Sequence, residues 1–321
     1  MSNILQQIED IGIVPVVTLG DVNKAKNLGS ALIKGGLNAA EVTFRVEGAD
    51  KVISAMAKHF PNMLVGAGTV LTEEQADRAV KAGAKFLVAP GLNAKVVKHC
   101  QSLGVTFIPG VSSASEVELA LELGLSHVKF FPAEQAGGVA YIKSISAPYT
   151  TVKFMPTGGV SDKNVNDYLS LNSVFACGGS WMVAGELIKS DNWDEVTRLT
   201  SLAVDKMLGF EFVHMGIHSS EQKSALAGAD KLVSLFGLDK KVGNSSVFIT
   251  PQIEITNTML YKKVGHIAIR TNSMKRAIAM LKSKGIALEE DSIKTKPDGS
   301  IHIAYLKDVD INGFAVHLIA K

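Results

Sequence analysis

The sequence predicts an α/β fold in two parts: a (β/α)8 TIM barrel over residues 1–209, and a smaller α+β domain of paired βαβββ-like modules over residues 210–321. Short β-rich runs alternate with amphipathic stretches from residue 12 to about 182, as in a parallel sheet with crossover helices. The alternation stops near residue 210, and a strand–helix–strands pattern then occurs twice. A length of 321 residues agrees with two domains, because single cores usually stop growing at about 250–300 residues.

Eight β-rich segments predict the strands of the barrel: Gly12–Leu19, Ala39–Arg45, Leu64–Val70, Phe86–Gly91, Thr106–Val111, His127–Pro132, Val152–Val160 and Val174–Trp181. Stretches with apolar residues at spacings of three and four predict helices at Val22–Lys34, Ala49–His59, Thr72–Ala82, Ala94–Leu103 and Ala114–Leu123. Two of these have capping signals, since Ser113 has Glu116 three residues on and Thr72 precedes two glutamates. An open doubly wound sheet is the alternative, but no G-x-G-x-x-G follows the first strand, which favours the barrel.

The second part is divided into elements by the same criteria. A helix at Asn192–Leu208 leads into a predicted strand at Gly209–Gly216. The later elements are a helix at Ala225–Phe236, one or two strands at Ser246–Thr256, a strand at Val264–Thr271, a helix at Met274–Lys284, and strands at Ile301–Leu306 and Gly313–Ile319. The boundary between the domains is therefore expected near residue 210.

Composition excludes several classes of protein. Lys and Arg number 33 against 31 for Asp and Glu, and no basic run occurs, so we expect no nucleic-acid partner. The two cysteines, Cys100 and Cys177, are far apart, which excludes a disulfide framework and favours a reducing compartment. The first residues lack the pattern of a signal peptide, and no apolar run approaches the roughly 18 residues of a membrane helix. We therefore expect a cytoplasmic protein with no membrane partner.

Ionisable residues on the inner faces of barrel strands are the candidates for catalysis. Lys129 lies in the sixth predicted strand beside two phenylalanines and a proline, where desolvation favours the neutral amine. A neutral lysine in a water-poor pocket attacks carbonyls and forms a Schiff base. Glu41, on the second predicted strand, is a candidate proton shuttle. The alternatives are a lysine whose charged end reaches solvent and a glutamate that only pairs with Lys129 or Arg45.

Two glycine pairs follow the last predicted strands of the barrel. Thr157-Gly158-Gly159 ends the seventh strand, and Gly178-Gly179-Ser180 ends the eighth. Barrels often bind a phosphate between these loops, where backbone N–H groups converge and glycine allows close approach. Glycines that only make tight turns would give the same pattern. Arg45 carries a planar guanidinium that fits a carboxylate, although a surface arginine is equally consistent with its position.

These motifs resemble those of the bacterial class I KDPG/KHG aldolases, which act on 2-keto-3-deoxy-6-phosphogluconate (KDPG) and 4-hydroxy-2-oxoglutarate (KHG). The resemblance covers roughly residues 4–208 and rests on EVTFR at 41–45, GAGTV at 66–70, PG at 90–91, KFFPAE at 129–134, PTGG at 156–159 and GGSW at 178–181. It implies that Lys129 is the Schiff-base lysine and Glu41 the general acid/base. The other implied contacts are Arg45 and Thr69 to the substrate carboxylate, Pro90 and Phe131 around the pyruvyl group, Thr157 to a hydroxyl, and Gly158, Gly159 and Ser180 to the phosphate.

The resemblance also implies a reaction and an assembly. KDPG would be cleaved to pyruvate and glyceraldehyde 3-phosphate, or KHG to pyruvate and glyoxylate, by a homotrimer whose barrel needs no cofactor. Two other functions stay open at this point. One is a metal-dependent aldolase or isomerase that uses the C-terminal histidines, and the other is a barrel that binds a sugar phosphate without turnover.

Histidines are concentrated in the C-terminal part, with five of the eight after residue 209. His214 and His266 lie in the opening strands of the two modules, which resemble the glyoxalase-like vicinal oxygen chelate fold around a divalent metal. The resemblance implies His214, Glu254, His266 and His317 as ligands. His317 stands where that family has a glutamate, and this donor set suits zinc, iron or nickel. Histidines that only satisfy hydrogen bonds, in a domain that serves assembly, are the alternative.

Overall fold

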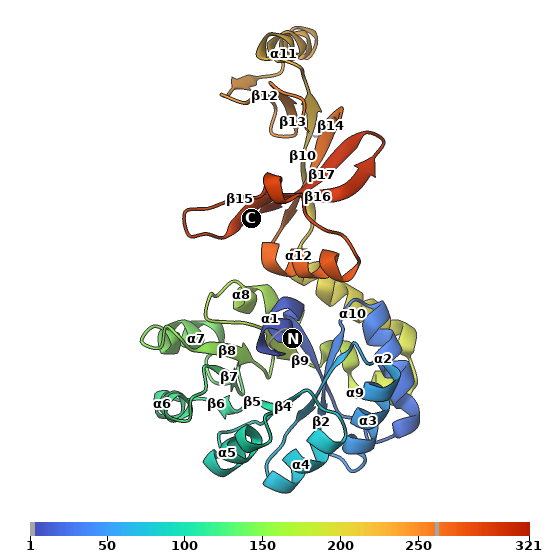
Figure 1. Ribbon diagram of the computed structural model, residues 1–321, viewed down its shortest axis with the longest axis vertical. Helices are drawn as coiled ribbons and strands as arrows, with labels where there is room; N and C mark the ends of the chain where they lie inside the picture. Colours follow the sequence, from blue (N-terminus) through green and yellow to red (C-terminus); the bar gives the residue numbers. More distant parts are fainter. Residues whose placement is uncertain (1–3, 261–262) are drawn as a thin grey trace. The chain divides into compact units, whose positions relative to one another are not determined.

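The computed structural model describes residues 4–260 and 263–321. The chain forms two compact units, the first ending at Met207 and the second beginning at Leu208 (Figure 1). Each unit has its own cluster of buried apolar side chains. The first three residues of the predicted barrel domain lie outside the described residues. Within the described ranges, no helix combines the length and the apolar character of a membrane span.

The first unit is an α/β barrel-like fold of parallel strands. One sheet has the order β5-β4-β3-β2-β1-β9, formed by Thr106–Ile108, Phe86–Val88, Leu64–Gly68, Ala39–Thr43, Ile13–Val17 and Cys177–Gly179. A second sheet has the order β6-β7-β8, formed by Gly110–Val111, His127–Phe130 and Lys153–Pro156. Parallel bridges from Phe154 to Val174 and from Thr157 to Gly178 join the β8 and β9 segments. Because the pairings are parallel, the C-terminal ends of the strands lie at one end of the unit.

Most of the predicted barrel strands extend beyond the observed ones at their C-terminal ends. The predicted strand Thr106–Val111 is divided by Pro109 into β5 and β6. Proline cannot donate to the ladder, which interrupts the pairing. A Cβ on Gly110 would lie 2.0 Å from the carbonyl oxygen of Pro90, so glycine permits a close approach of the two loops.

Helices surround the strands of the first unit in Figure 1. They are α2 (Ala25–Lys34), α3 (Ala49–His59), α4 (Glu73–Lys81), α5 (Ala94–Ser102), α6 (Ala114–Glu122), α7 (Gly138–Ser146), α8 (Val165–Leu169), α9 (Gly185–Lys189) and α10 (Trp193–Leu208). The predicted caps are confirmed: Thr72 accepts from the N–H of Gln75, and Ser113 and Glu116 form a capping box.

Helix α1 (Ile4–Ile11) packs against the N-terminal end of the barrel-like unit. Its Ile8 is fully buried in a cluster with Ala39, Leu64 and Phe86, the first residues of β2, β3 and β4. Apolar side chains therefore fill this end of the interior. A polar site inside the barrel can open only toward the C-terminal ends of the strands.

The second unit is built on a mixed sheet of order β11-β12-β13-β10-β14-β17-β16-β15. The strands are Lys240–Val242, Ser246–Ile249, Ile253–Thr256, Glu211–His218, Gly265–Thr271, Phe314–Ala320, Ile301–Ile311 and Lys294–Thr295. In each half the first strand is parallel to the last, β10 to β13 and β14 to β17. Antiparallel pairing of β10 with β14 joins the halves. Helix α11 (Gln222–Phe236) belongs to the first half and α12 (Met274–Ser283) to the second.

The predicted opening strand Gly209–Gly216 is observed two residues later, as β10. The segment Ser246–Thr256 is two strands, β12 and β13, with Thr250 at a φ of 61° between them. Neither β11 nor β15 was predicted, because both are short strands with charged residues at the edges of the sheet. The later position of β10 brings His218 into the same strand as His214, four residues away and therefore on the same face.

Candidate active site and candidate metal centre

The interior of the first unit brings Lys129 and Glu41 together. Each is the third residue of its strand, β7 and β2 respectively. These strands are not neighbours in either sheet, so their side chains can meet only through the interior. Nζ of Lys129 lies 3.4 Å from Oε1 of Glu41, and the two residues are 3% and 0% exposed. The structure thus places the two predicted residues in one buried ion pair.

The carboxyl group of Glu41 lies against the backbone of β3. A Cβ on Gly68 would lie 2.2 Å from Oε1 of Glu41, so only glycine leaves room for the carboxylate here. Oε2 of Glu41 is buried and has no hydrogen-bond partner among the described residues. A buried carboxylate oxygen in this state can exchange a proton with a bound molecule.

Apolar groups surround the amine of Lys129. The Phe131 ring centroid lies 5.5 Å from Nζ, and Val128 and Phe130 on either side in the chain are fully buried. Gly110 of β6 and Met155 of β8 are the strand partners of Lys129. Exclusion of water strengthens electrostatic interactions inside the pocket, so removing either partner of the pair leaves an uncompensated charge.

Five predicted substrate-binding residues follow a strand by one or two positions: Arg45, Thr69, Pro90, Phe131 and Thr157. Since the strands are parallel, these residues lie at the end toward which the Lys129 pocket can open. Arg45 is exposed in the turn after β2. Thr69 has a φ of 57°, a conformation that costs energy for a β-branched residue and is common at functional sites.

The two glycine loops lie next to each other at this end. Thr157 bridges to Gly178, and a Cβ on Gly178 would lie 2.4 Å from the Thr157 hydroxyl oxygen. Gly158 and Gly159 have φ values of 99° and 80°, which require glycine. Ser180 is exposed directly after β9. Two loops of this kind can present backbone N–H groups to an anion.

Glu134 and Tyr168 support the first of these loops, and sequence reasoning did not select either. The N–H of Glu134 donates to the carbonyl oxygen of Gly158 at 3.0 Å, and a Cβ on Gly159 would lie 2.4 Å from Cγ of Glu134. Tyr168 of α8 is fully buried and donates its hydroxyl to Glu134 Oε1. Burial and this bond raise the pKa of Tyr168. The sequence pointed to Glu134 through its place in the KFFPAE motif, whereas no motif included Tyr168.

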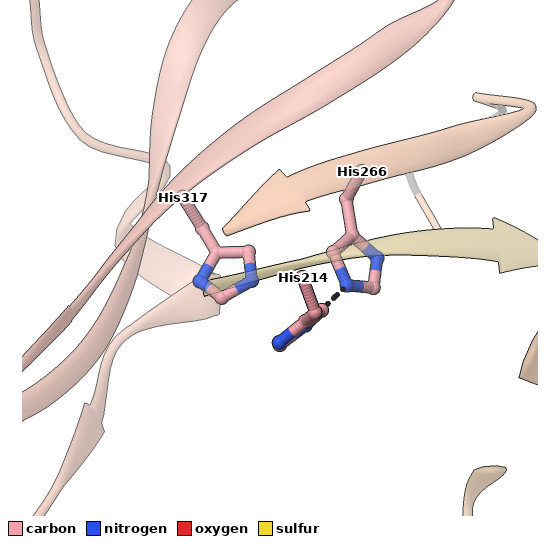
Figure 2. Close-up of side chains that lie close together, drawn as sticks. All are labelled: His214, His266 and His317. Atoms are coloured by element: carbon pink, nitrogen blue, oxygen red, sulfur yellow. Dashed lines mark hydrogen bonds between the residues drawn. The ribbon is translucent and has the colours of Figure 1, made fainter. Parts of the chain in front are cut away.

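The second unit gathers the four predicted metal ligands on one face of its sheet, and Figure 2 shows the three histidines. The Nε2 atoms of His214 and His266 are 3.1 Å apart. Oε2 of Glu254 lies 3.3 Å from the first and 3.1 Å from the second. Candidate ligand atoms of the three buried histidines, including His317, lie within 4.8 Å of one another. Side chains from four strands therefore converge on one point.

Strand register explains this convergence. The residue two after His214 pairs with Glu254, and the residue two after His266 pairs with His317. Paired residues and residues two apart share a face of the sheet. The two halves therefore present equivalent positions, His214 with His266 and Glu254 with His317.

The charges in this cluster fit a divalent cation. Burial alone would raise the pKa of Glu254, but the imidazoles of His214 and His266 and the hydroxyl of Ser246 outweigh burial and hold it well below its usual range. Burial, assisted by His266, lowers the pKa of His317 to about 4. At neutral pH the cluster thus contains an ionised carboxylate and a neutral imidazole, which are the forms that bind zinc and similar metals.

His218 and Tyr305 extend the cluster beyond the predicted ligands. Nε2 of His218 lies 3.0 Å from Nδ1 of His266, and Nδ1 of His218 lies 2.8 Å from the carbonyl oxygen of Lys263. The Tyr305 ring centroid is 4.7 Å from that of His317. Tyr305 also lines a cavity of about 490 Å³ with Lys263 and other residues. The sequence contained a signal for His218, because residues four apart in a strand, such as His214 and His218, lie on the same face.

Comparison with known proteins locates the relatives of the first unit. A family model described as KDPG and KHG aldolase matches residues 4–199, which end before the second unit. The chain is 46% identical over 204 residues to the 2-dehydro-3-deoxy-phosphogluconate aldolase of Haemophilus influenzae, covering 64% of this chain and 96% of that protein. It is 41% identical over 193 residues to the KHG/KDPG aldolase of Escherichia coli K12, covering 60% and 91%.

A solved structure shows the same similarity in three dimensions. The KDPG aldolase of Legionella pneumophila, with pyruvate captured as a covalent carbinolamine intermediate, is 39% identical and has a TM-score of 0.60. The match covers 62% of this chain and 97% of that chain. Nearly the whole length of the Legionella enzyme is therefore matched by part of the present chain.

Proposed function

The chain belongs to the KDPG and KHG aldolase family, and on that premise we propose that it cleaves KDPG to pyruvate and glyceraldehyde 3-phosphate as a class I aldolase. KHG, cleaved to pyruvate and glyoxylate, is the second substrate. The observation that carries this proposal is the buried pair of Lys129 and Glu41, 3.4 Å apart in the barrel interior. An amine and a proton-accepting group at this distance are what imine chemistry requires.

The first half of the mechanism builds the imine. Lys129 passes a proton to Glu41, and its free amine attacks the C2 carbonyl of the 2-oxo acid to give a carbinolamine. Loss of water, with Glu41 supplying the proton to the departing hydroxyl, leaves a protonated imine between Nζ and C2. The positive imine nitrogen is an electron sink next to C3.

The second half breaks the carbon–carbon bond. Glu41, directly or through a water molecule, takes the proton of the C4 hydroxyl as the C3–C4 bond breaks. The bonding electrons move into an enamine, and the aldehyde leaves. Protonation of C3 restores the imine, and its hydrolysis releases pyruvate and returns the amine of Lys129. Oε2 of Glu41 has no hydrogen-bond partner in the described part of the chain, and this supports the shuttle role.

The residues at the strand ends bind the rest of the substrate. Arg45 and Thr69 hold the carboxylate, Pro90 and Phe131 enclose the pyruvyl group, Thr157 bonds a substrate hydroxyl, and Gly158, Gly159 and Ser180 receive the phosphate. The location of these residues after successive parallel strands supports these roles. The left-handed conformations of Gly158 and Gly159 support the phosphate site.

Covalent trapping tests the mechanism. We expect incubation with pyruvate and borohydride to add a reduced pyruvyl group to Lys129, identified by mass spectrometry, and EDTA to leave the yield unchanged. Turnover that EDTA abolishes, with no adduct on Lys129, would instead indicate a metal-dependent enzyme. Tight binding of KDPG with no pyruvate released would indicate a barrel that binds without turnover.

We also propose that the strands close into a complete (β/α)8 barrel and that the chain works as a cytoplasmic homotrimer with small molecules as its partners. The bridges between the β8 and β9 segments and the continuity of β5 with β6 across Pro109 support closure. The resemblance to trimeric aldolases supports the assembly. Light scattering of the full chain should give three times its mass of 34.1 kDa.

For the second unit we propose a glyoxalase-like domain, beginning near residue 210, that binds a divalent metal through His214, Glu254, His266 and His317. The equivalent positions of these residues in the two halves of the sheet support it. A metal bound there would act as a Lewis acid, and the four side chains would fix its position. Metal content after purification with and without chelator tests this proposal. A stoichiometric ion that the His266→Ala variant loses is the expected result.

A further inference from the structure

We propose that His218 is a positioning residue that fixes the tautomer of His266 and directs its Nε2 lone pair toward the metal. This inference rests on the proposed metal centre and concerns a residue outside its four ligands. His218 is 9% exposed in β10. Its Nε2 contacts Nδ1 of His266, whereas Glu254 and His214 contact Nε2 of His266.

The tautomers follow from donors and acceptors. A carbonyl oxygen can only accept, so the 2.8 Å contact with Lys263 requires a hydrogen on Nδ1 of His218. The N–H of Leu260, at 3.4 Å from the same nitrogen, is the longer and weaker contact. A neutral imidazole has one N–H, so Nε2 of His218 is an acceptor. At 3.0 Å it accepts from Nδ1 of His266, which leaves the lone pair of His266 on Nε2.

This lone pair faces the point where the cluster converges. Nε2 of His266 lies 3.1 Å from Oε2 of Glu254 and 3.1 Å from Nε2 of His214. This lone pair and the carboxylate oxygen repel each other unless a positive charge, either a proton or a metal ion, lies between them. The series from the Lys263 carbonyl through His218 to His266 therefore prepares a cation site. Outer hydrogen bonds of this kind commonly fix the orientation of a histidine ligand.

The backbone fixes the same ring from another side. A Cβ on Gly216 would lie 2.0 Å from Cε1 and 2.4 Å from Nε2 of His266, so the ring lies directly over the glycine. The equivalent position in the other half of the sheet is not a histidine. This position is Arg270, which lies four residues after His266 and pairs with Glu211. We therefore expect His266 to depend on an outer partner that its counterpart His214 does not share.

The experiment measures Co²⁺ binding to the full chain by visible absorption and by competition with a chelator. His218→Phe removes both hydrogen bonds, and we expect it to weaken Co²⁺ binding about 10–100-fold. His218→Gln can still donate to the Lys263 carbonyl and accept from His266, so it should stay within about threefold of the wild type. His302→Phe, which removes a histidine of the same unit outside the cluster, should bind like the wild type.

The outcomes separate the relay from the centre on which it rests. If the wild type binds no Co²⁺, the proposed centre fails. If the wild type binds and His218→Phe binds equally well, the centre stands and the relay is wrong. If His218→Gln is as weak as His218→Phe, the two hydrogen bonds do not account for the effect and the positioning role is also overturned.

A second measurement reads the tautomer itself and does not depend on how well a variant folds. Long-range ¹H–¹⁵N spectra of the histidine-labelled wild-type chain distinguish protonated from unprotonated ring nitrogens. We expect His266 to carry a hydrogen on Nδ1 in the metal-free chain and also after Zn²⁺ is added. An unprotonated Nδ1 of His266 in either state would contradict the relay.

Discussion

The two units bury charged groups in different ways. In the first unit one amine and one carboxylate, from strands that are not neighbours, balance each other at 3.4 Å. In the second unit the carboxylate of Glu254 faces imidazoles, and burial lowers the pKa of two members of the cluster, His218 and His317. The charges of the first site are therefore balanced within the chain, whereas the metal that we propose for the second site would balance the carboxylate of Glu254. Both units bury polar groups, and we propose that these groups support metal-free chemistry in the first unit and metal binding in the second.

The largest expected effect tests the first half of this comparison. Lys129→Ala removes the nucleophile, and we expect at least a ~10⁴-fold loss of kcat for pyruvate release. Both tryptophans, Trp181 and Trp193, lie in the first unit, so an unchanged fluorescence unfolding curve would show that this unit still folds. Activity of the variant above about 1% of the wild type would remove Lys129 from the mechanism.

Removal of metal tests the second half. Dialysis against EDTA should leave aldolase turnover unchanged and should destabilise the second unit. A ligand at 100 times its Kd stabilises a folded unit by about 2.7 kcal/mol, so a loss of this order is expected on chelation. Hydrogen exchange of β10 and β14 would measure it, because tryptophan fluorescence reports the first unit alone. Equal exchange in the loaded and chelated protein would speak against a structural metal.

A charge at the phosphate site sharpens the comparison within the first unit. Ser180→Asp should reduce kcat/KM for KDPG about 10–100-fold more than for KHG. The new carboxylate repels the phosphate of KDPG, whereas KHG carries no phosphate. Ser180→Ala, which adds no charge, is the matched control. Equal losses on the two substrates would place the phosphate elsewhere.

The smallest expected effect is a pH dependence of stability in the first unit. Burial lowers the pKa of His127, whose ring meets that of Phe175 at 4.8 Å. Below about pH 6.5 the unfolded chain takes up a proton that the folded chain resists, so stability declines as the pH falls through this value. Tryptophan-detected unfolding of His127→Gln should show a flatter pH profile than the wild type. Parallel profiles would exclude this contribution.

Much of the first unit could be predicted from local sequence. The alternation of strand and helix patterns, the caps at Thr72 and Ser113, and the glycine loops each depend on residues close together in the chain. The second unit was predicted less fully. Its edge strands β11 and β15 are too short and too charged to give a periodic signal, and His218 was counted among the histidines without being given a role.

The sequence by itself determined which residues could do chemistry: a lysine among apolar neighbours, a glutamate on an alternating strand, and histidines in the strands of a repeated module. Only the tertiary structure decided which of them meet. Lys129 and Glu41 are 88 residues apart, and His214 and His266 are 52 apart. Periodicity and capping act over a few residues, whereas such distances depend on strand register and on how the whole sheet closes. The contact of His218 with His266 belongs to this second kind, since it exists only because β10 and β14 pair in one register.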